Sequence, residues 1–275
     1  MPAIDNFIEL KGIRLHYCAW GPADGAPVVL LHGGSAHAHW WELFAESIGD
    51  RYRAIAFELR GHGDSAHAQP PVYRLSDYAG DIAAAVAQMR LPAFHLIGHS
   101  LGAMIAGVFA VSNPQALSSL TLIDSQMRFS AAAVRYLQRL SRFPHLVYRD
   151  QATAIRRFRV LPTETNASRA VIERMGSKAF HQDGDGRWVL KFDRASLAQL
   201  EPIDLVPSLA HLDLPICIVR GELSSVLTHE HAKALQDRLP RARLLEIENA
   251  HHHVMLDNPS AFGVAMRTFL DERTN

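Results

Sequence analysis

The pentapeptide Gly98-His99-Ser100-Leu101-Gly102 has the residue types and the spacing of a serine nucleophile. An apolar run, 94–97, precedes it, and a second apolar run at helical spacing, 103–110, follows it. This context predicts a strand, a tight turn and a helix, with the serine at the turn in strained backbone angles. The flanking glycines let backbone atoms approach where a Cβ atom would clash. We therefore predict a reactive hydroxyl at the carboxyl end of a sheet, at a helix start whose amides point towards a bound group.

The elements that must position this serine alternate in type along the chain. The pattern predicts strands at 13–19, 28–32, 53–57, 94–97, 120–123, 216–220 and 244–247. It predicts helices at 40–47, 76–89, 103–110, 230–239 and 259–270, with Ser76 as the N-cap of the second. Such alternation predicts an α/β fold, with a mostly parallel central sheet flanked by helices on both faces.

The segment 126–211 interrupts this alternation. Its apolar residues fall at helical spacing and strand-like runs are scarce, which predicts a helical insertion between two parts of one core, 1–125 and 212–275. Residues 128–194 hold 14 Lys and Arg against six Asp and Glu, a formal charge of +8, so the rest of the chain carries −8. Solvated helix faces account for such a charge, and the alternative is a positive lid that attracts anionic substrates.

The composition excludes several classes of protein. The formal net charge is zero, which argues against nucleic-acid binding, and no apolar run is long enough to span a bilayer. The N-terminus lacks the basic start and apolar core of a signal peptide. Cys18 and Cys217 lie far apart in apolar surroundings and are expected to be reduced. We expect a cytoplasmic protein that acts on a small molecule and binds neither nucleic acid nor a membrane.

Four ordered motifs resemble those of the α/β-hydrolase superfamily. They are Leu31-His32-Gly33-Gly34-Ser35, the segment 59–65 (LRGHGDS), the tight turn 98–102 around Ser100, here called the elbow, and the segment 251–259 (HHHVMLDNP). The resemblance covers nearly the whole chain outside 126–211. It implies the α/β-hydrolase fold, and it implies that the middle insertion is a helical cap over the active site.

The resemblance also implies a base for the serine. A serine hydroxyl needs a neighbouring base, and in this family the base is a histidine that follows the acid in the chain. Alignment on Asp257 and Pro259 places it at His252, with His251 as the alternative. The run of three histidines also suggests a metal site. Adjacent residues on an extended loop point in different directions, however, and no ligand cluster has metal-like spacing nearby. We therefore expect no metal and no cofactor.

The acid departs from the family pattern. Most relatives place an aspartate shortly after the strand that here ends at Gly221, but the loop 221–226 (GELSSV) has serine at that position. Asp124 ends the preceding strand, where some members of the superfamily carry their acid, and Glu222 lies in the usual loop. An acid is needed to orient the imidazole and to stabilise the imidazolium. We predict Asp124, with Glu222 as the alternative.

Two backbone amides are expected to form the oxyanion hole. One belongs to Leu101, the residue after the nucleophile, and the other to Gly34. A loop that follows closely supplies four candidate pocket residues, namely His37, His39, Trp40 and Trp41.

The resemblance implies a serine hydrolase that cleaves a small carboxylic ester or a lactone through an acyl-enzyme. A related carbonyl substrate, including a β-diketone-type C–C bond, fits the same machinery. One alternative is a cofactor-free dioxygenase of the same fold, in which a histidine–aspartate pair deprotonates an aromatic hydroxyl. A second alternative is a non-enzymatic ligand receptor on the same scaffold.

Overall fold

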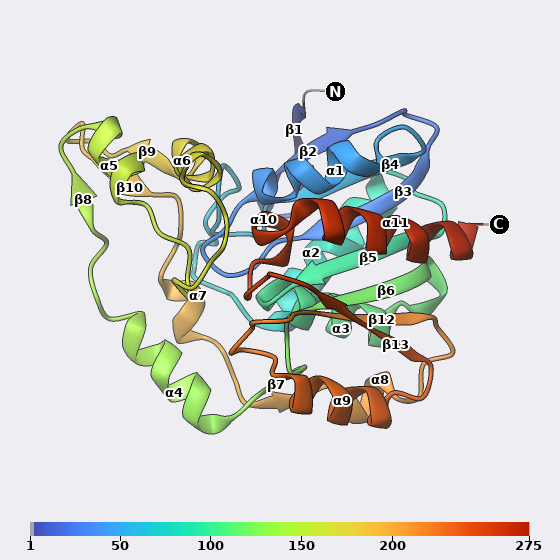
Figure 1. The fold of residues 1–275 in the computed structure, drawn as a ribbon. Helices are drawn as coiled ribbons and strands as arrows, with labels where there is room; N and C mark the ends of the chain where they lie inside the picture. The colour runs from blue at the N-terminus through green and yellow to red at the C-terminus, as the bar shows by residue number, and fades with distance from the viewer. Residues whose placement is uncertain (1–2, 275) are drawn as a thin grey trace.

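The computed structural model describes residues 3–274, and its centre is an eight-stranded sheet (Figure 1). The strand order is β1-β2-β4-β3-β5-β6-β12-β13. The first two pairings are antiparallel, and every pairing from β4 to β13 is parallel. The strands are β1 (Ile4–Leu10), β2 (Ile13–Trp20), β3 (Ala26–Leu31), β4 (Tyr52–Phe57), β5 (Phe94–His99), β6 (Leu117–Ile123), β12 (Ile216–Gly221) and β13 (Ala242–Ile247). The predicted, mostly parallel sheet is confirmed.

The central strands owe their position to continuous apolar sequence. Every residue of β5 and β12 is buried, as are nearly all residues of β3 and β6, because helices cover both faces of the sheet. The edge strands β1 and β13 are largely exposed or half-buried. The strand β1 was not predicted, since its mixed polar sequence lacks a core-facing pattern and it pairs only with β2.

Helices on the two faces close two separate hydrophobic clusters. One cluster involves α2 (Leu75–Gln88), α3 (Leu101–Ser112) and α9 (His229–Arg238). The other involves α1 (Glu42–Ile48), α10 (Val254–Asp257) and α11 (Pro259–Thr274). There are also two 3-10 turns: η1 (Ala38–Trp41), whose residues are all buried, and η2 (Pro114–Ala116), which has no buried residue. Figure 1 shows α1 and α11 on the opposite side of the sheet from α3 and α9. None of the described helices is long and apolar enough to cross a membrane.

One predicted helix start is wrong. Arg74, not Ser76, occupies the N-cap position of α2. The carboxylate of Asp77 accepts a hydrogen bond of 2.8 Å from the Arg74 amide, and this contact fixes the start two residues earlier. Ser76 therefore lies inside the first turn.

The segment between β6 and β12 contains more than helices. Its helices are α4 (Ala131–Leu140), α5 (Gln151–Arg157), α6 (Arg169–Lys178), α7 (Ala195–Ala198) and α8 (Val206–Leu209). Its strands are β7 (Arg128–Phe129), β8 (Val147–Tyr148), β9 (Phe180–Gln182), β10 (Trp188–Leu190) and β11 (Ile203–Asp204). They form a three-stranded sheet, β8-β10-β9, and a β11-β7 pair. Strands of two or three residues are too short to produce a period-two pattern, so the sequence predicted helices alone.

The same segment is attached to the core through α5 and α6. Ala154, Ile172 and Met175 join the hydrophobic cluster of α1 and η1. His37, which precedes η1, forms a hydrogen bond of 3.0 Å with the Met175 carbonyl. In Figure 1, α5 and α6 lie together at one end of the sheet, and α4 stands apart from it.

Candidate active site

Ser100 lies in the sharp turn between β5 and α3, with φ 54° and ψ −114°. A positive φ is uncommon for a residue with a side chain, and it marks stored backbone strain. The turn requires both glycines. A Cβ atom on Gly98 would lie 2.2 Å from the Gly102 carbonyl oxygen, and one on Gly102 would lie 2.3 Å from the Leu31 oxygen. The Ser100 amide donates to the Ile123 carbonyl at 2.9 Å, which ties the turn to β6.

Asp124 and His252 meet beside this turn. Asp124 directly follows β6, has a φ of 49° and is completely buried, while His252 lies on the loop between β13 and α10. The His252 Nδ1 atom is 2.9 Å from Asp124 Oδ1. Because a carboxylate only accepts hydrogen bonds, Nδ1 must carry the proton, and Nε2 remains as the basic nitrogen. His251 differs, since its amide donates to Asp257 and it forms no contact with Asp124 among the described residues.

The loop after β12 holds the carboxylate of Asp124 through two hydrogen bonds. The Ser224 hydroxyl donates to Asp124 Oδ1 at 2.6 Å, and the Gly221 amide donates to Oδ2 at 3.0 Å. The serine at the family's usual aspartate position thus holds the aspartate of the neighbouring strand. Glu222 is exposed, and its carboxylate accepts a hydrogen bond of 2.9 Å from the Asn249 amide. Of the two candidate acids, the structure brings only Asp124 to His252.

Burial dominates the electrostatics of this pair. Burial raises the pKa of Asp124 to about 6, although the hydrogen bonds from Ser224 and Gly221 lower it. Burial, together with the neighbouring His253, lowers the pKa of His252 to about 3. Both effects penalise charge, so the imidazole is neutral at neutral pH. A neutral imidazole is the form that can take a proton from a hydroxyl group.

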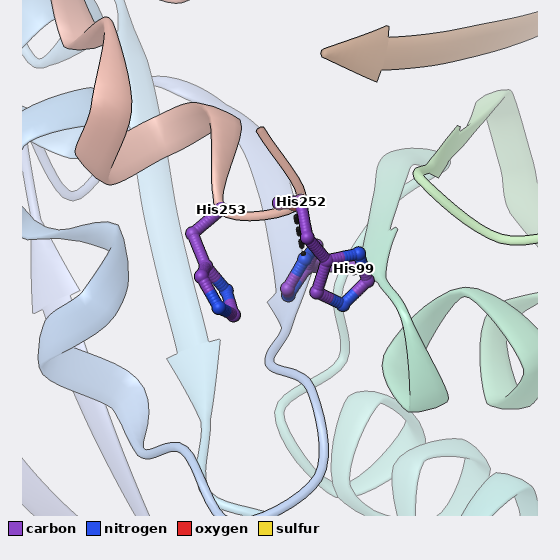
Figure 2. Close-up of side chains that lie close together, drawn as sticks. All are labelled: His99, His252 and His253. Carbon is purple, nitrogen blue, oxygen red and sulfur yellow. Dashed lines mark hydrogen bonds between the residues drawn. The ribbon is translucent and has the colours of Figure 1, made fainter. Parts of the chain in front are cut away.

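Two further histidines surround His252 (Figure 2). The ring of His99, the residue before Ser100, lies 4.6 Å from that of His252, and the ring of His253 lies 4.9 Å from it. His99 Nε2 also forms a hydrogen bond of 2.9 Å with the His252 carbonyl, drawn as the dashed line. The elbow therefore fixes the backbone of the loop that carries His252. One nitrogen from each ring falls in a group within 4.8 Å, yet hydrogen bonds already occupy His99 Nε2, His252 Nδ1 and His253 Nε2.

The two expected oxyanion amides flank the elbow. Leu101 begins α3, and Gly34 is exposed on the loop after β3. Within residues 3–274 neither amide has a hydrogen-bond partner. A Cβ atom on Gly33 would lie 3.3 Å from the Ser100 Cβ, so this loop runs close to the serine. His32 holds the loop, because its ring bonds to the Gly33 carbonyl at 2.7 Å and accepts from the Leu59 amide at 3.1 Å.

The four candidate pocket residues separate in the structure. The ring of Trp40 packs edge-on against that of His253 at 5.2 Å, next to the histidine group. His37 binds the inserted segment through the Met175 carbonyl. Trp41 is completely buried in the core. His39 points elsewhere, towards Asp5 and Cys18 of the β1-β2 hairpin.

Three residues near this site escaped the sequence reasoning. His99 is the variable position of the elbow motif, Ser224 was noted only as a missing aspartate, and His253 was considered only as part of the histidine run. A signal existed for Ser224, since a serine that replaces an acid beside a second acid can donate to it. The contacts of His99 and His253 depend on how the last loop folds.

Comparison with known proteins agrees with this fold. The family model described as "alpha/beta hydrolase fold" matches residues 26–259. The pimeloyl-[acyl-carrier protein] methyl ester esterase of Aeromonas hydrophila is 29% identical over 256 residues, covering 87% of this chain and 93% of that protein. The putative carbamate hydrolase RutD of Klebsiella pneumoniae is 24% identical over 248 residues, covering 90% and 92%.

A solved structure shows the same architecture. The crystal structure of E-2-(acetamidomethylene)succinate hydrolase matches with a TM-score of 0.87 and 24% identity, covering 98% of this chain and 100% of that one. At this identity the likeness shows the fold alone. Together with the family match and the hydrolase relatives, these findings establish that the chain belongs to the α/β-hydrolase family and is a hydrolase of that type.

Proposed function

We propose that the protein is a serine esterase that cleaves a small carboxylic ester or a lactone through an acyl-enzyme. The observation that carries this proposal is the hydrogen bond of 2.9 Å between Asp124 and His252, beside the strained turn at Ser100. A buried acid, a neutral imidazole and a serine at a sharp turn are the parts of a nucleophilic triad.

In the proposed acylation step, the Ser100 hydroxyl oxygen attacks the ester carbonyl while His252 Nε2 takes the hydroxyl proton. The Asp124 carboxylate stabilises the imidazolium that forms. The amides of Gly34 and Leu101 donate to the oxyanion of the tetrahedral intermediate. This intermediate collapses as the carbonyl bond re-forms, and His252 gives its proton to the departing alcohol.

Deacylation repeats the sequence with water. His252 takes a proton from water, the hydroxide attacks the acyl carbon, and the same two amides hold the second oxyanion. Collapse of this intermediate breaks the bond to the Ser100 oxygen. The proton on His252 returns to that oxygen, and the carboxylic acid product leaves.

The relatives favour an ester over the other candidate substrates. One of them is named as a methyl ester esterase and another as a putative carbamate hydrolase, and both names describe attack on an acyl carbonyl. The same His252–Asp124 pair could deprotonate an aromatic hydroxyl, as the dioxygenase alternative requires, but these names favour hydrolysis.

We also propose that residues 126–211 form a cap and that the substrate carries a negative charge. The +8 charge of residues 128–194 supports this, although ion pairs neutralise part of it. These pairs include Arg174 with Glu42, Lys191 with Asp64 and Arg187 with Asp183. For an ester that ends in a carboxylate, we expect kcat/KM to fall as ionic strength rises. For a neutral ester of equal length it should stay constant.

The nucleophile is tested by labelling and by kinetics. A fluorophosphonate probe should label the wild-type protein once, and p-nitrophenyl esters of increasing chain length should be hydrolysed. Ser100→Ala should abolish labelling and lower kcat by about 10⁴-fold or more, with an unchanged melting temperature. The matched control is Ser112→Ala, at an exposed serine that ends α3, which should retain both. Labelling or turnover retained by Ser100→Ala would refute the proposal.

A further inference from the structure

A second group of polar side chains gathers at the β1-β2 edge of the sheet, on this hairpin and on η1. Asp5 and Cys18 are direct cross-strand partners in this hairpin. His16 lies two residues before Cys18, and therefore on the same face of β2. The turn η1 adds a second histidine from a distant part of the chain. We call this group the edge cluster, and its members are Asp5, His16, Cys18 and His39.

Four pairwise distances within the edge cluster lie close to those of a tetrahedral ligand set, and Asp5, His16 and Cys18 each offer one ligand atom within 4.8 Å of the others. Asp5 Oδ1 is 3.1 Å from His16 Nε2, 3.5 Å from Cys18 Sγ and 3.6 Å from His39 Nε2. Cys18 Sγ is 3.7 Å from His39 Nε2. Ligands bound to zinc at about 2.0 to 2.3 Å in tetrahedral geometry are separated by about 3.3 to 3.8 Å.

A hydrogen-bond network explains this arrangement less well than a cation does. Two ring nitrogens and a thiol sulfur all converge on one oxygen atom, Asp5 Oδ1. The in-plane lone pairs of that oxygen number two, so three donors cannot all align with them. A cation between the four atoms would satisfy each of them at once.

Glu58 completes the arrangement from behind His16. Its Oε2 atom lies 3.0 Å from His16 Nδ1, the ring nitrogen that faces away from Asp5. The Glu58 side chain is only 2% exposed and also accepts a hydrogen bond from the Ala38 amide, so its position is fixed. A carboxylate that holds the outer nitrogen of a histidine is the usual support of a metal-binding imidazole.

The charge and softness of the ligands select the metal. One thiolate, one carboxylate and two neutral imidazoles carry −2 in total, which balances a divalent cation. A thiolate and imidazoles favour Zn²⁺ over Mg²⁺ or Ca²⁺. Cys18 is completely buried, whereas the Asp5 side chain is 55% exposed, so a cation would enter from the Asp5 side.

From these contacts we propose that the edge cluster binds one zinc ion, which fastens the β1-β2 hairpin to η1. As the ion binds, the Cys18 thiol forms a sulfur–zinc bond and its proton leaves to solvent. All four coordination positions are then filled by protein atoms. Such a closed site has no position for a substrate, so its role is structural.

The experiment uses the full chain, stripped with a chelator and titrated with Zn²⁺ alone. We expect one bound zinc per chain by elemental analysis. At a free concentration a hundredfold above Kd, we expect a melting temperature about 5 °C higher. Co²⁺ in place of Zn²⁺ should give a thiolate charge-transfer band. No stoichiometric metal, or Co²⁺ bound without that band, would overturn the proposal.

Variants locate the metal. Cys18→Ala and Asp5→Asn should each lose stoichiometric zinc and the thermal shift, and Asp5→Asn provides the test if Cys18→Ala does not fold. Cys217→Ala, at the other buried cysteine, is the control and should bind zinc as the wild type does. Zinc retained by both Cys18→Ala and Asp5→Asn would overturn the assignment. Metal bound instead at His99, His252 and His253 would also overturn it, and would be recognised by inhibited ester hydrolysis.

Discussion

Among the described residues, a histidine meets a carboxylate in a buried group at Asp124 and in a group at the β1-β2 hairpin whose carboxylate, Asp5, reaches the surface. The two groups differ in how many polar atoms are left without a hydrogen-bond partner. At the carboxyl ends of β6 and β12, the carboxylate of Asp124 is shared among His252, Ser224 and a backbone amide. Within residues 3–274, His252 Nε2 has no hydrogen-bond partner. At the β1-β2 hairpin, one polar atom each of His16, Cys18 and His39 lies near the same oxygen, Asp5 Oδ1. The first arrangement leaves a base for a reacting group, and the second is suited to hold an ion.

The difference follows from where each group lies in the sheet. Parallel strands bring their carboxyl ends to one edge, so loops from separate strands place different side chains around an opening. An antiparallel hairpin instead sets residues of two strands directly opposite each other, as it does Asp5 and Cys18. Variants that change only one of the two groups test this difference between them.

The largest expected effect in this comparison concerns the two candidate bases. His252→Ala should lower kcat/KM by about 10⁴-fold or more, because no other imidazole contacts Asp124 in the described chain. His251→Ala should change it less than about twofold. Steady-state kinetics with a p-nitrophenyl ester measures both. If only His251→Ala lost activity, the general base would be His251 and not His252.

A smaller effect is expected for the serine that supports the acid. Ser224→Ala removes a charge-assisted hydrogen bond to Asp124 and should lower kcat/KM by about tenfold. That hydrogen bond lowers the pKa of Asp124, so its loss should also shift the acid limb of the pH profile to higher pH. The exposed neighbour Ser225 supplies the control variant, Ser225→Ala, which should match the wild type. An unshifted acid limb in Ser224→Ala would argue against this role.

The smallest expected change is the decline of kcat/KM of the wild-type enzyme at low pH. Burial raises the pKa of Asp124 to about 6 and lowers that of His252, so the pair is ready to accept a proton at neutral pH. As pH falls, the pair takes up a proton and loses its basic form. We expect kcat/KM to be constant above pH 7 and to decline below about pH 6. An acid limb centred above pH 7 would indicate a different titrating group.

Local sequence determined what could be predicted. The elbow was predictable because its strand, turn and helix are contiguous, and the steric reason for its two glycines holds in the structure. The choice between Asp124 and Glu222 remained open in the sequence. It depends on which of the two carboxylates contacts the loop that carries His252, between β13 and α10. The start of α2 was placed wrongly because Asp77, not Ser76, supplies the capping contact.

The edge cluster could not be predicted in the same way. Its four members are separated by as many as 34 positions, and their convergence depends on the register that pairs Asp5 with Cys18 and on the position of η1. Neither the β1-β2 register nor the position of η1 can be recognised from regularly spaced residues in the sequence. The short strands between β6 and β12 were missed for a related reason, since pairing between distant segments forms them.

We propose that the acid of the catalytic site comes from the end of β6 and not from the loop after β12. The direct measurement compares kcat/KM of Asp124→Asn with that of Glu222→Gln, both with melting temperatures recorded. We expect Asp124→Asn to lose about 10⁴-fold, because an amide cannot hold the imidazole in the required tautomer, and Glu222→Gln to stay within about twofold. A large loss in Glu222→Gln together with near wild-type activity in Asp124→Asn would contradict the claim.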